Sequence, residues 1–222
     1  MNDTIAKLLN EQINKEFYSA YLYLDISNYY DEQDLDGYAH YYMVQAQEER
    51  DHALLFMKYM QNNGLKVTLD AIGKPDKTFT NLLEPLEVAA EHERYVTALI
   101  NNIYHEAHQN KDYRTMKFLD WFVDEQMEEE DSADTMVSRY KLFGQDPKGL
   151  YLLDQEYAAR VYTAPSLTLY QKKTTGFGRW FFAYVDYCLT VNHLMTFLTH
   201  RMVRGMEPSR TRIETIRWAI QL

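Results

Sequence analysis

Residues 45–52 read QAQEERDH and set Glu49 and His52 three positions apart. In an α-helix this spacing directs both side chains to the same face. We predict a helix over residues 38–62, because the Asn-Gly pair that follows at 63–64 is a typical helix stop. This helix therefore carries two groups near its middle that could bind a metal ion.

Three more long helices are predicted around this one. Between residues 4 and 30 the apolar side chains recur with a helical period, and the polar run 31–37 interrupts it. The remaining helices are predicted over residues 82–109, 112–143 and, as a short closing element, 147–157. Eight glycines and five prolines are few for 222 residues, which favours long helices over a loop-rich β fold. The sequence therefore predicts an all-α fold.

The lengths of the connections predict how these helices pack. Short turns after the first and third long helices favour antiparallel hairpins. Residues 65–81 could reach about 55 Å when extended, whereas a helix of 25 residues is about 40 Å long. We therefore expect this segment to cross over and to leave the second and third helices parallel. The predicted architecture is a four-helix bundle with one long crossover and a short fifth helix.

Several acidic side chains lie on helix faces that should be buried. The candidate groups, one or two on each long helix, are Glu16, Glu49, His52, Glu93, Gln126 and Glu129. Burying several carboxylates together is very costly unless cations neutralise them. Two metal ions would do so, and oxygen ligands with a single imidazole suit iron, manganese or magnesium better than zinc. The alternative is that these acids form an ordinary solvated face.

Charge divides the chain into two parts. Residues 1–157 carry 14 basic and 30 acidic side chains, a net charge of −16, whereas residues 158–222 carry 9 and 3, a net charge of +6. We expect a bundle over residues 1–160 and a basic extension, helical or disordered, over 161–222. The negative bundle argues against nucleic-acid binding. A single cysteine excludes a disulfide framework and, with an N-terminus unlike a signal peptide, favours the cytoplasm.

Four stretches resemble those of non-haem bacterial ferritins, and the resemblance covers residues 4–157. They are NEQINKEFYSAYLYL (10–24), AQEERDH (46–52), EHERYVTALIN (91–101) and FLDWFVDEQMEEE (118–130). The resemblance implies a ferritin-like bundle that assembles into a hollow shell of 24 subunits. It also implies iron storage, in which dioxygen or hydrogen peroxide oxidises Fe(II) and the product is deposited as mineral. The negative charge of the bundle agrees, because it would concentrate Fe(II).

The motifs of this family match residue by residue. The residues implied to hold a pair of iron ions, with Glu49 bridging them, are Glu16, Glu49, His52, Glu93, Gln126 and Glu129. Those implied for a third, weaker iron position are Glu48, Glu125 and Glu128. Tyr23 matches the family's tyrosine beside the centre, where it could bind a ligand or supply an electron. Glu49 and Tyr23 are therefore the candidate catalytic residues.

Two positions depart from related di-iron families. Bacterioferritins carry a second Glu-x-x-His in the fourth helix, where this chain has Gln126 and Glu129. Without that imidazole the second iron should be held weakly, which suits an ion that moves on to a mineral. Bacterioferritins also place a haem-ligating Met after the bridging Glu, and because that residue is Arg50 here, we expect no haem. Rubrerythrin-like peroxidases need paired cysteines, which a single cysteine excludes.

The basic extension leaves several interpretations open. Residues 180–198 are nearly long enough to span a bilayer, but polar residues interrupt the run. The extension is interpreted as a segment foreign to the family, as a docking or membrane-surface anchor, or as a nucleic-acid-binding tail. Two alternatives to iron storage follow for the whole protein. One is a non-catalytic cage or scaffold that binds cations, and the other is a membrane-associated di-iron oxidase anchored by the extension.

Overall fold

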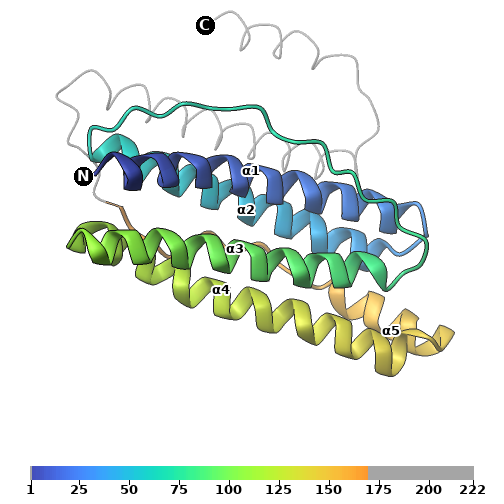
Figure 1. Cartoon of the computed structure of the whole chain (residues 1–222). Helices are drawn as coiled ribbons and strands as arrows, with labels where there is room; N and C mark the ends of the chain where they lie inside the picture. Colours follow the sequence, from blue (N-terminus) through green and yellow to red (C-terminus); the bar gives the residue numbers. More distant parts are fainter. Residues whose placement is uncertain (1, 170–222) are drawn as a thin grey trace, which may run out of the picture. The chain divides into compact units, whose positions relative to one another are not determined.

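The computed structural model describes residues 2–169, and within this range it contains helices and no strand. The helices are α1 (Asp3–Asp31), α2 (Asp36–Asn62), α3 (Glu84–Gln109), α4 (Tyr113–Arg139), the π-helix η1 (Tyr140–Gly144) and α5 (Pro147–Tyr157). The first four form a four-helix bundle (Figure 1). The all-α prediction is confirmed, and the predicted bounds agree within one or two residues. The one difference in kind is the end of the fourth helix, whose last turn is a π-helix.

The helices begin and end where the sequence supplies caps. The Asn2 side chain accepts a hydrogen bond from the Thr4 amide at the start of α1. Gly64 follows α2 with a φ of 72°, a left-handed conformation that glycine adopts without steric cost. The Leu65 amide then returns to the Met60 carbonyl oxygen, which satisfies an acceptor at the helix end. The predicted stop of the second helix is therefore confirmed.

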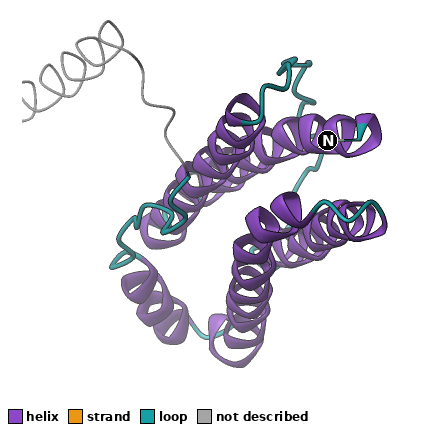
Figure 2. Ribbon diagram, turned by 90° about the vertical axis from the view of Figure 1, so that its left-hand side faces the viewer, coloured by secondary structure: helices purple, strands orange, loops and turns teal. Residues whose placement is uncertain are grey.

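Residues 65–81 connect α2 to α3 along the length of α1 (Figure 1). Two side chains of α1 hold this segment. Asn10 bonds both backbone groups of Thr68, at 2.8 and 2.9 Å, and Asn14 donates to the Ala71 carbonyl oxygen at 3.0 Å. Because the segment runs the length of the bundle, α2 and α3 are parallel, while α1 with α2 and α3 with α4 form two antiparallel pairs (Figure 1). Figure 2 shows the helices of the bundle in a view turned by 90°. The predicted crossover is confirmed.

Two hydrophobic clusters fill the bundle, and a polar layer separates them. One cluster is rich in tyrosine and includes Tyr30 and Tyr42, and the other includes Ile13, Phe56 and Phe122. Each long helix passes from one cluster to the other through buried polar residues. These are Gln12, Glu16, Gln45, Glu49, His52, Glu93, Gln126 and Glu129. The fold thus concentrates the acidic residues of four helices at mid-bundle.

α5 docks on the start of α2 through Asp154. The Oδ1 atom of this buried residue accepts hydrogen bonds from the amides of Gly37 and Tyr38, at 2.8 and 3.1 Å. Leu35, which precedes α2, offers no side-chain cap, so Asp154 satisfies the free amides of the first turn instead. The approach is so close that a Cβ at Gly37 would lie 1.7 Å from the Asp154 carbonyl oxygen.

Residues 158–169, which we call the strap, follow α5 and lie against α2 and α4. His40 Nε2 lies 2.8 Å from the carbonyl oxygen of Arg160, and Trp121 Nε1 donates to Ser166 Oγ at 3.0 Å. Two leucines near the end of the strap pack against the cluster that contains Phe56 and Phe122. The strap is therefore part of the packed bundle.

Within residues 2–169, no helix is long and apolar enough to cross a bilayer. The basic extension predicted over residues 161–222 lies outside the described residues from position 170 onward, and so does the candidate span 180–198. Its interpretations as a foreign segment, an anchor or a nucleic-acid-binding tail therefore concern residues that the structure does not describe.

Candidate metal centre

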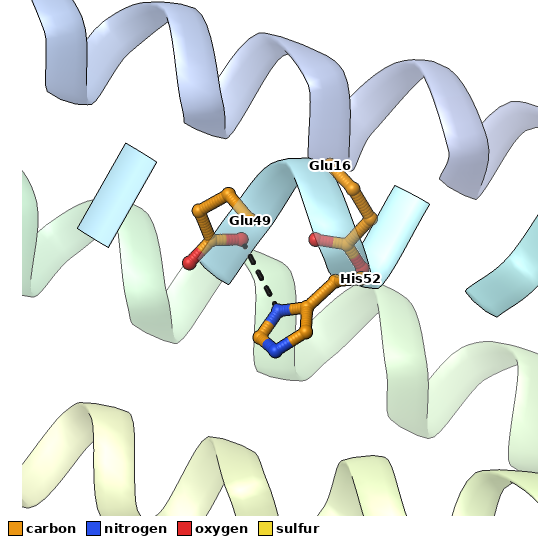
Figure 3. Close-up of side chains that lie close together, drawn as sticks. All are labelled: Glu16, Glu49 and His52. Atoms are coloured by element: carbon orange, nitrogen blue, oxygen red, sulfur yellow. Dashed lines mark ion pairs between the residues drawn. The ribbon is translucent and has the colours of Figure 1, made fainter. Parts of the chain in front are cut away.

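Glu16 from α1 meets Glu49 and His52 from α2 at the middle of the bundle (Figure 3). One ligand atom of each residue lies within 4.8 Å of the others, and only 1 to 2% of each residue is exposed. His52 Nδ1 lies 3.5 Å from Glu49 Oε2. Two carboxylates and one imidazole thus face one another in a dry environment, which is a donor set that metal ions accept.

Glu93 from α3 and Glu129 from α4 complete this cluster. Gln45 Nε2 donates to Glu49 Oε1 at 3.2 Å and to Glu129 Oε2 at 2.8 Å, so that one amide joins two carboxylates. Gln126 Nε2 donates to Glu93 Oε2 at 3.2 Å. The structure therefore brings together all six residues that the resemblance implied for the pair of iron ions, and all six are buried.

Tyr23 lies at the edge of the same cluster. Its hydroxyl donates to Glu93 Oε1, and its ring stacks on that of Tyr42, with centroids 5.7 Å apart. Trp121 contacts the other side of the cluster, where its ring lies 5.5 Å from the His52 ring. Of these aromatic residues, Tyr23 forms a direct hydrogen bond with one of the clustered carboxylates.

Gln12 and Gln45 support the cluster, although the sequence patterns above did not predict them. Gln12 Nε2 donates to Glu16 Oε1 at 2.9 Å, much as Gln45 donates to Glu49. Each glutamine precedes its glutamate by four residues, and this spacing places the two side chains on one helix face. The Gln-x-x-x-Glu spacing repeated on the first two helices is the signal that points to both residues.

Two buried oxygen atoms of the cluster, Glu16 Oε2 and Gln45 Oε1, receive no hydrogen bond from the described residues. A buried polar atom without a partner costs about 1–3 kcal/mol. Glu16 Oε2 belongs to the group that it forms with Glu49 and His52. A cation among these residues would give this oxygen the partner that it lacks.

Burial and mutual repulsion shift the protonation of the cluster. Burial, followed by the charge of Glu49, raises the pKa of Glu16 and of Glu129 to about 8. The same causes raise the pKa of Glu93 well above its usual value. Burial alone would lower the pKa of His52, but its hydrogen bond with Glu49 and the surrounding carboxylates raise it to about 10. Bound protons thus offset the negative charge when no metal ion does so.

Metal-free protein is expected to lose stability as the pH rises from about 5 to about 9. The folded state keeps protons on Glu16 and Glu129 up to about pH 8, and on His52 up to about pH 10. The unfolded chain releases them near the ordinary pKa values of 4.5 and 6.5. Because the folded state binds more protons throughout this range, its free energy of unfolding should fall continuously as the pH rises.

Denaturant unfolding of chelator-treated protein at several pH values measures this effect. Protein loaded with metal provides the comparison, because metal ions replace the protons and bind more tightly at higher pH. A midpoint that rises with pH between about 6 and 8 in the metal-free protein would contradict the prediction.

Glu48, Glu125 and Glu128 gather beside the cluster. They line a pocket of about 370 Å³ to which His52 and Glu129 also contribute. Glu125 Oε1 lies 3.8 Å from His52 Nε2, so the pocket adjoins the buried cluster directly. Glu48 already pairs with a cationic side chain of the strap, a contact that the sequence did not predict.

The family profile of the ferritin-like domain matches residues 6–143, more than half of the chain. The chain belongs to the ferritin family. It is 41% identical over 155 residues to the bacterial non-heme ferritin of Campylobacter jejuni, covering 70% of this chain and 93% of that protein. It is 38% identical over 160 residues to a bacterial non-heme ferritin of Staphylococcus epidermidis, covering 72% and 96% respectively. The resemblance read from the motifs is confirmed.

Solved ferritin structures agree with the fold of this ferritin family member. A closed form of the Archaeoglobus fulgidus ferritin, made by site-directed mutagenesis, matches with a TM-score of 0.72 and 39% identity, covering 73% of this chain and 99% of that one. The open-pore ferritin of the same archaeon matches with a TM-score of 0.71 and 38% identity, covering 72% and 99%. The matched part of this chain therefore corresponds to nearly a whole ferritin chain.

Proposed function

We propose that this protein stores iron and that the buried cluster is its ferroxidase site. The observation that carries the proposal is the convergence of four buried carboxylates and one imidazole from four helices. Burying this group in its ionised form is very costly unless cations neutralise it, and membership of the ferritin family points to iron as the cation. Iron is the substrate here: Fe(II) enters, loses an electron and leaves as Fe(III) for the mineral.

The proposal includes two iron positions. We assign one Fe(II) to Glu16, Glu49 and His52, whose ligand atoms lie within 4.8 Å of one another. We assign the second to Glu93 and Glu129, with Glu49 shared between the two ions. Anionic oxygen ligands stabilise Fe(III) more than Fe(II), so they favour oxidation. Dioxygen or hydrogen peroxide is the proposed electron acceptor, and no haem is part of the proposal.

The second ion is proposed to be the more mobile one. Gln126 donates a hydrogen bond to Glu93, so it acts as a support for a ligand. An ion held mainly by carboxylates exchanges more readily than one that also binds an imidazole. We propose that Tyr23, which is hydrogen-bonded to Glu93, supplies an electron. The acidic pocket beside His52 offers oxidised iron a third position on its way to the mineral.

A hollow shell of 24 subunits is also part of the proposal. α1 and α2 expose large apolar side chains, and three of them, each 40 to 52% exposed, line one groove, namely Tyr21, Leu24 and Met43. Apolar patches of this kind commonly mark interfaces, and other copies of the chain are the partners that membership of the ferritin family suggests. The net charge of −16 over residues 1–157 suits uptake of Fe(II). The reducing cytoplasm is the proposed compartment.

Crystals soaked anaerobically in Fe(II) test the proposal. Anomalous difference maps at the iron edge should show one peak against Glu16 and His52 and a second against Glu93 and Glu129. Crystals of Glu16→Ala should lose most of the first peak. Exposed carboxylates elsewhere on the bundle are the internal control and should show weak peaks or none. Iron found only at exposed carboxylates, with none in the cluster, would overturn the proposal.

A further inference from the structure

The strap places a guanidinium in the acidic pocket beside the cluster. Arg160 Nη2 pairs with Glu48 Oε2, and Nη1 donates to the Tyr41 carbonyl oxygen at 3.3 Å. The guanidinium also stacks on the Tyr41 ring, 4.0 Å from its centroid. Both charged side chains are largely buried, with 20% of Arg160 and 16% of Glu48 exposed. An arginine held by stacking and by two hydrogen bonds keeps a defined position.

The guanidinium lies where a further cation would bind. Four carboxylates line the pocket, those of Glu48, Glu125, Glu128 and Glu129, and Arg160 is the one lysine or arginine among the described residues that line it. The strap therefore neutralises and orients Glu48, one of the three carboxylates assigned to the third metal position, which are those of Glu48, Glu125 and Glu128.

We propose that Arg160 is a built-in competitor of the third metal ion. An ion that binds Glu48 Oε2 has to displace the guanidinium, an ion at the other oxygen meets its repulsion, and this competition keeps the third position weak. The inference rests on the proposed function, because it concerns the path by which iron leaves the cluster. A weak third position lets an ion pass on, whereas a tight one would hold it.

The effect of the Arg160 charge on metal binding can be tested separately from the effect of the strap covering the pocket. Tyr162 donates to Asp51, and Ser166 accepts from Trp121 at 3.0 Å. These two contacts should keep the strap in place when Arg160 loses its charge. Removing one neighbouring positive charge from a partly buried site commonly tightens cation binding by about tenfold or more.

Zn²⁺ is a suitable probe, because it is not oxidised and accepts carboxylate and imidazole ligands. Calorimetric titration of the full chain should resolve ions in the cluster from a weaker ion in the pocket. Arg160→Gln should lower the dissociation constant of the most weakly bound Zn²⁺ ion by at least about tenfold. The dissociation constants of the ions in the cluster should change by less than about twofold. Adding Glu48→Gln should abolish the gain, which would assign the affected ion to the pocket.

Variants that keep the Arg160 charge are the controls. Tyr162→Phe and Ser166→Ala each remove a hydrogen bond of the strap and should not increase the affinity for the most weakly bound Zn²⁺ ion. Arg139→Gln removes another arginine–glutamate pair, with Glu156 at 2.6 Å, and controls for net charge. An unchanged or weaker third ion in Arg160→Gln would overturn the inference, as would equal tightening in Tyr162→Phe. If no Zn²⁺ bound in the cluster in any variant, the proposed function itself would be overturned. The titration separates that result from a failure of the inference about Arg160, because it resolves ions in the cluster from the ion in the pocket.

Discussion

Glu49→Ala should abolish rapid Fe(II)-dependent oxygen uptake. Glu49 faces both halves of the cluster, since it lies 3.5 Å from His52 and shares the Gln45 amide with Glu129. In the proposed function Glu49 is the common ligand of two irons, so its loss should prevent them from acting together on one oxygen molecule. Initial rates measured with an oxygen electrode should fall by at least about 100-fold.

Two variants make this result interpretable. Glu49→Gln keeps the volume of the side chain and should fold like the wild-type protein while losing the rate. Glu91→Ala removes an exposed carboxylate from α3, two residues before Glu93, and should leave the rate unchanged. Rapid uptake that survives in both Glu49 variants would refute the proposed role of this residue. Wild-type protein without rapid uptake would support the alternative of a passive cation-binding cage.

Gly37→Ala should lower the apparent free energy of unfolding by about 3 kcal/mol or more. The new Cβ would lie 1.7 Å from the Asp154 carbonyl oxygen and 2.8 Å from its Oδ1. Because the nearest obstacle is backbone, α5 has to move away as a whole. That movement also breaks the two hydrogen bonds that Asp154 accepts from the first turn of α2, and unpaired amides are costly.

Denaturant unfolding at a fixed protein concentration measures this change, since assembly makes stability depend on concentration. Gly73→Ala is the matched control, because its Cβ would meet the Tyr18 ring at an ordinary contact distance of 3.6 Å. It should change the free energy of unfolding by less than about 0.5 kcal/mol. A loss below about 1 kcal/mol in Gly37→Ala would show that α5 can be displaced at little cost, contrary to the prediction.

Local patterns were enough to predict the bundle and to place its acidic residues on the buried faces of the helices. The helical period and the stop at Gly64 gave the helices within one or two residues, because both signals act within a few positions. Only a connection as long as residues 65–81 could make α2 and α3 parallel. Glu49 and His52 were expected on one face because they lie three residues apart. The π-helical end of the fourth helix was not predicted, and we have no sequence signal for it.

By itself, the sequence determined which helices form and which of their side chains face the centre of the bundle. Only the tertiary structure decided what those side chains touch. Gln45 donates a hydrogen bond to Glu129, 84 residues away in the sequence. Arg160 pairs with Glu48, 112 residues away, and Asp154 accepts from the Gly37 amide, 117 residues away. A helical period specifies the face of a residue but carries no information about the segment that docks there. Those partners depend on how distant helices and the strap pack together, which is settled by the whole core at once.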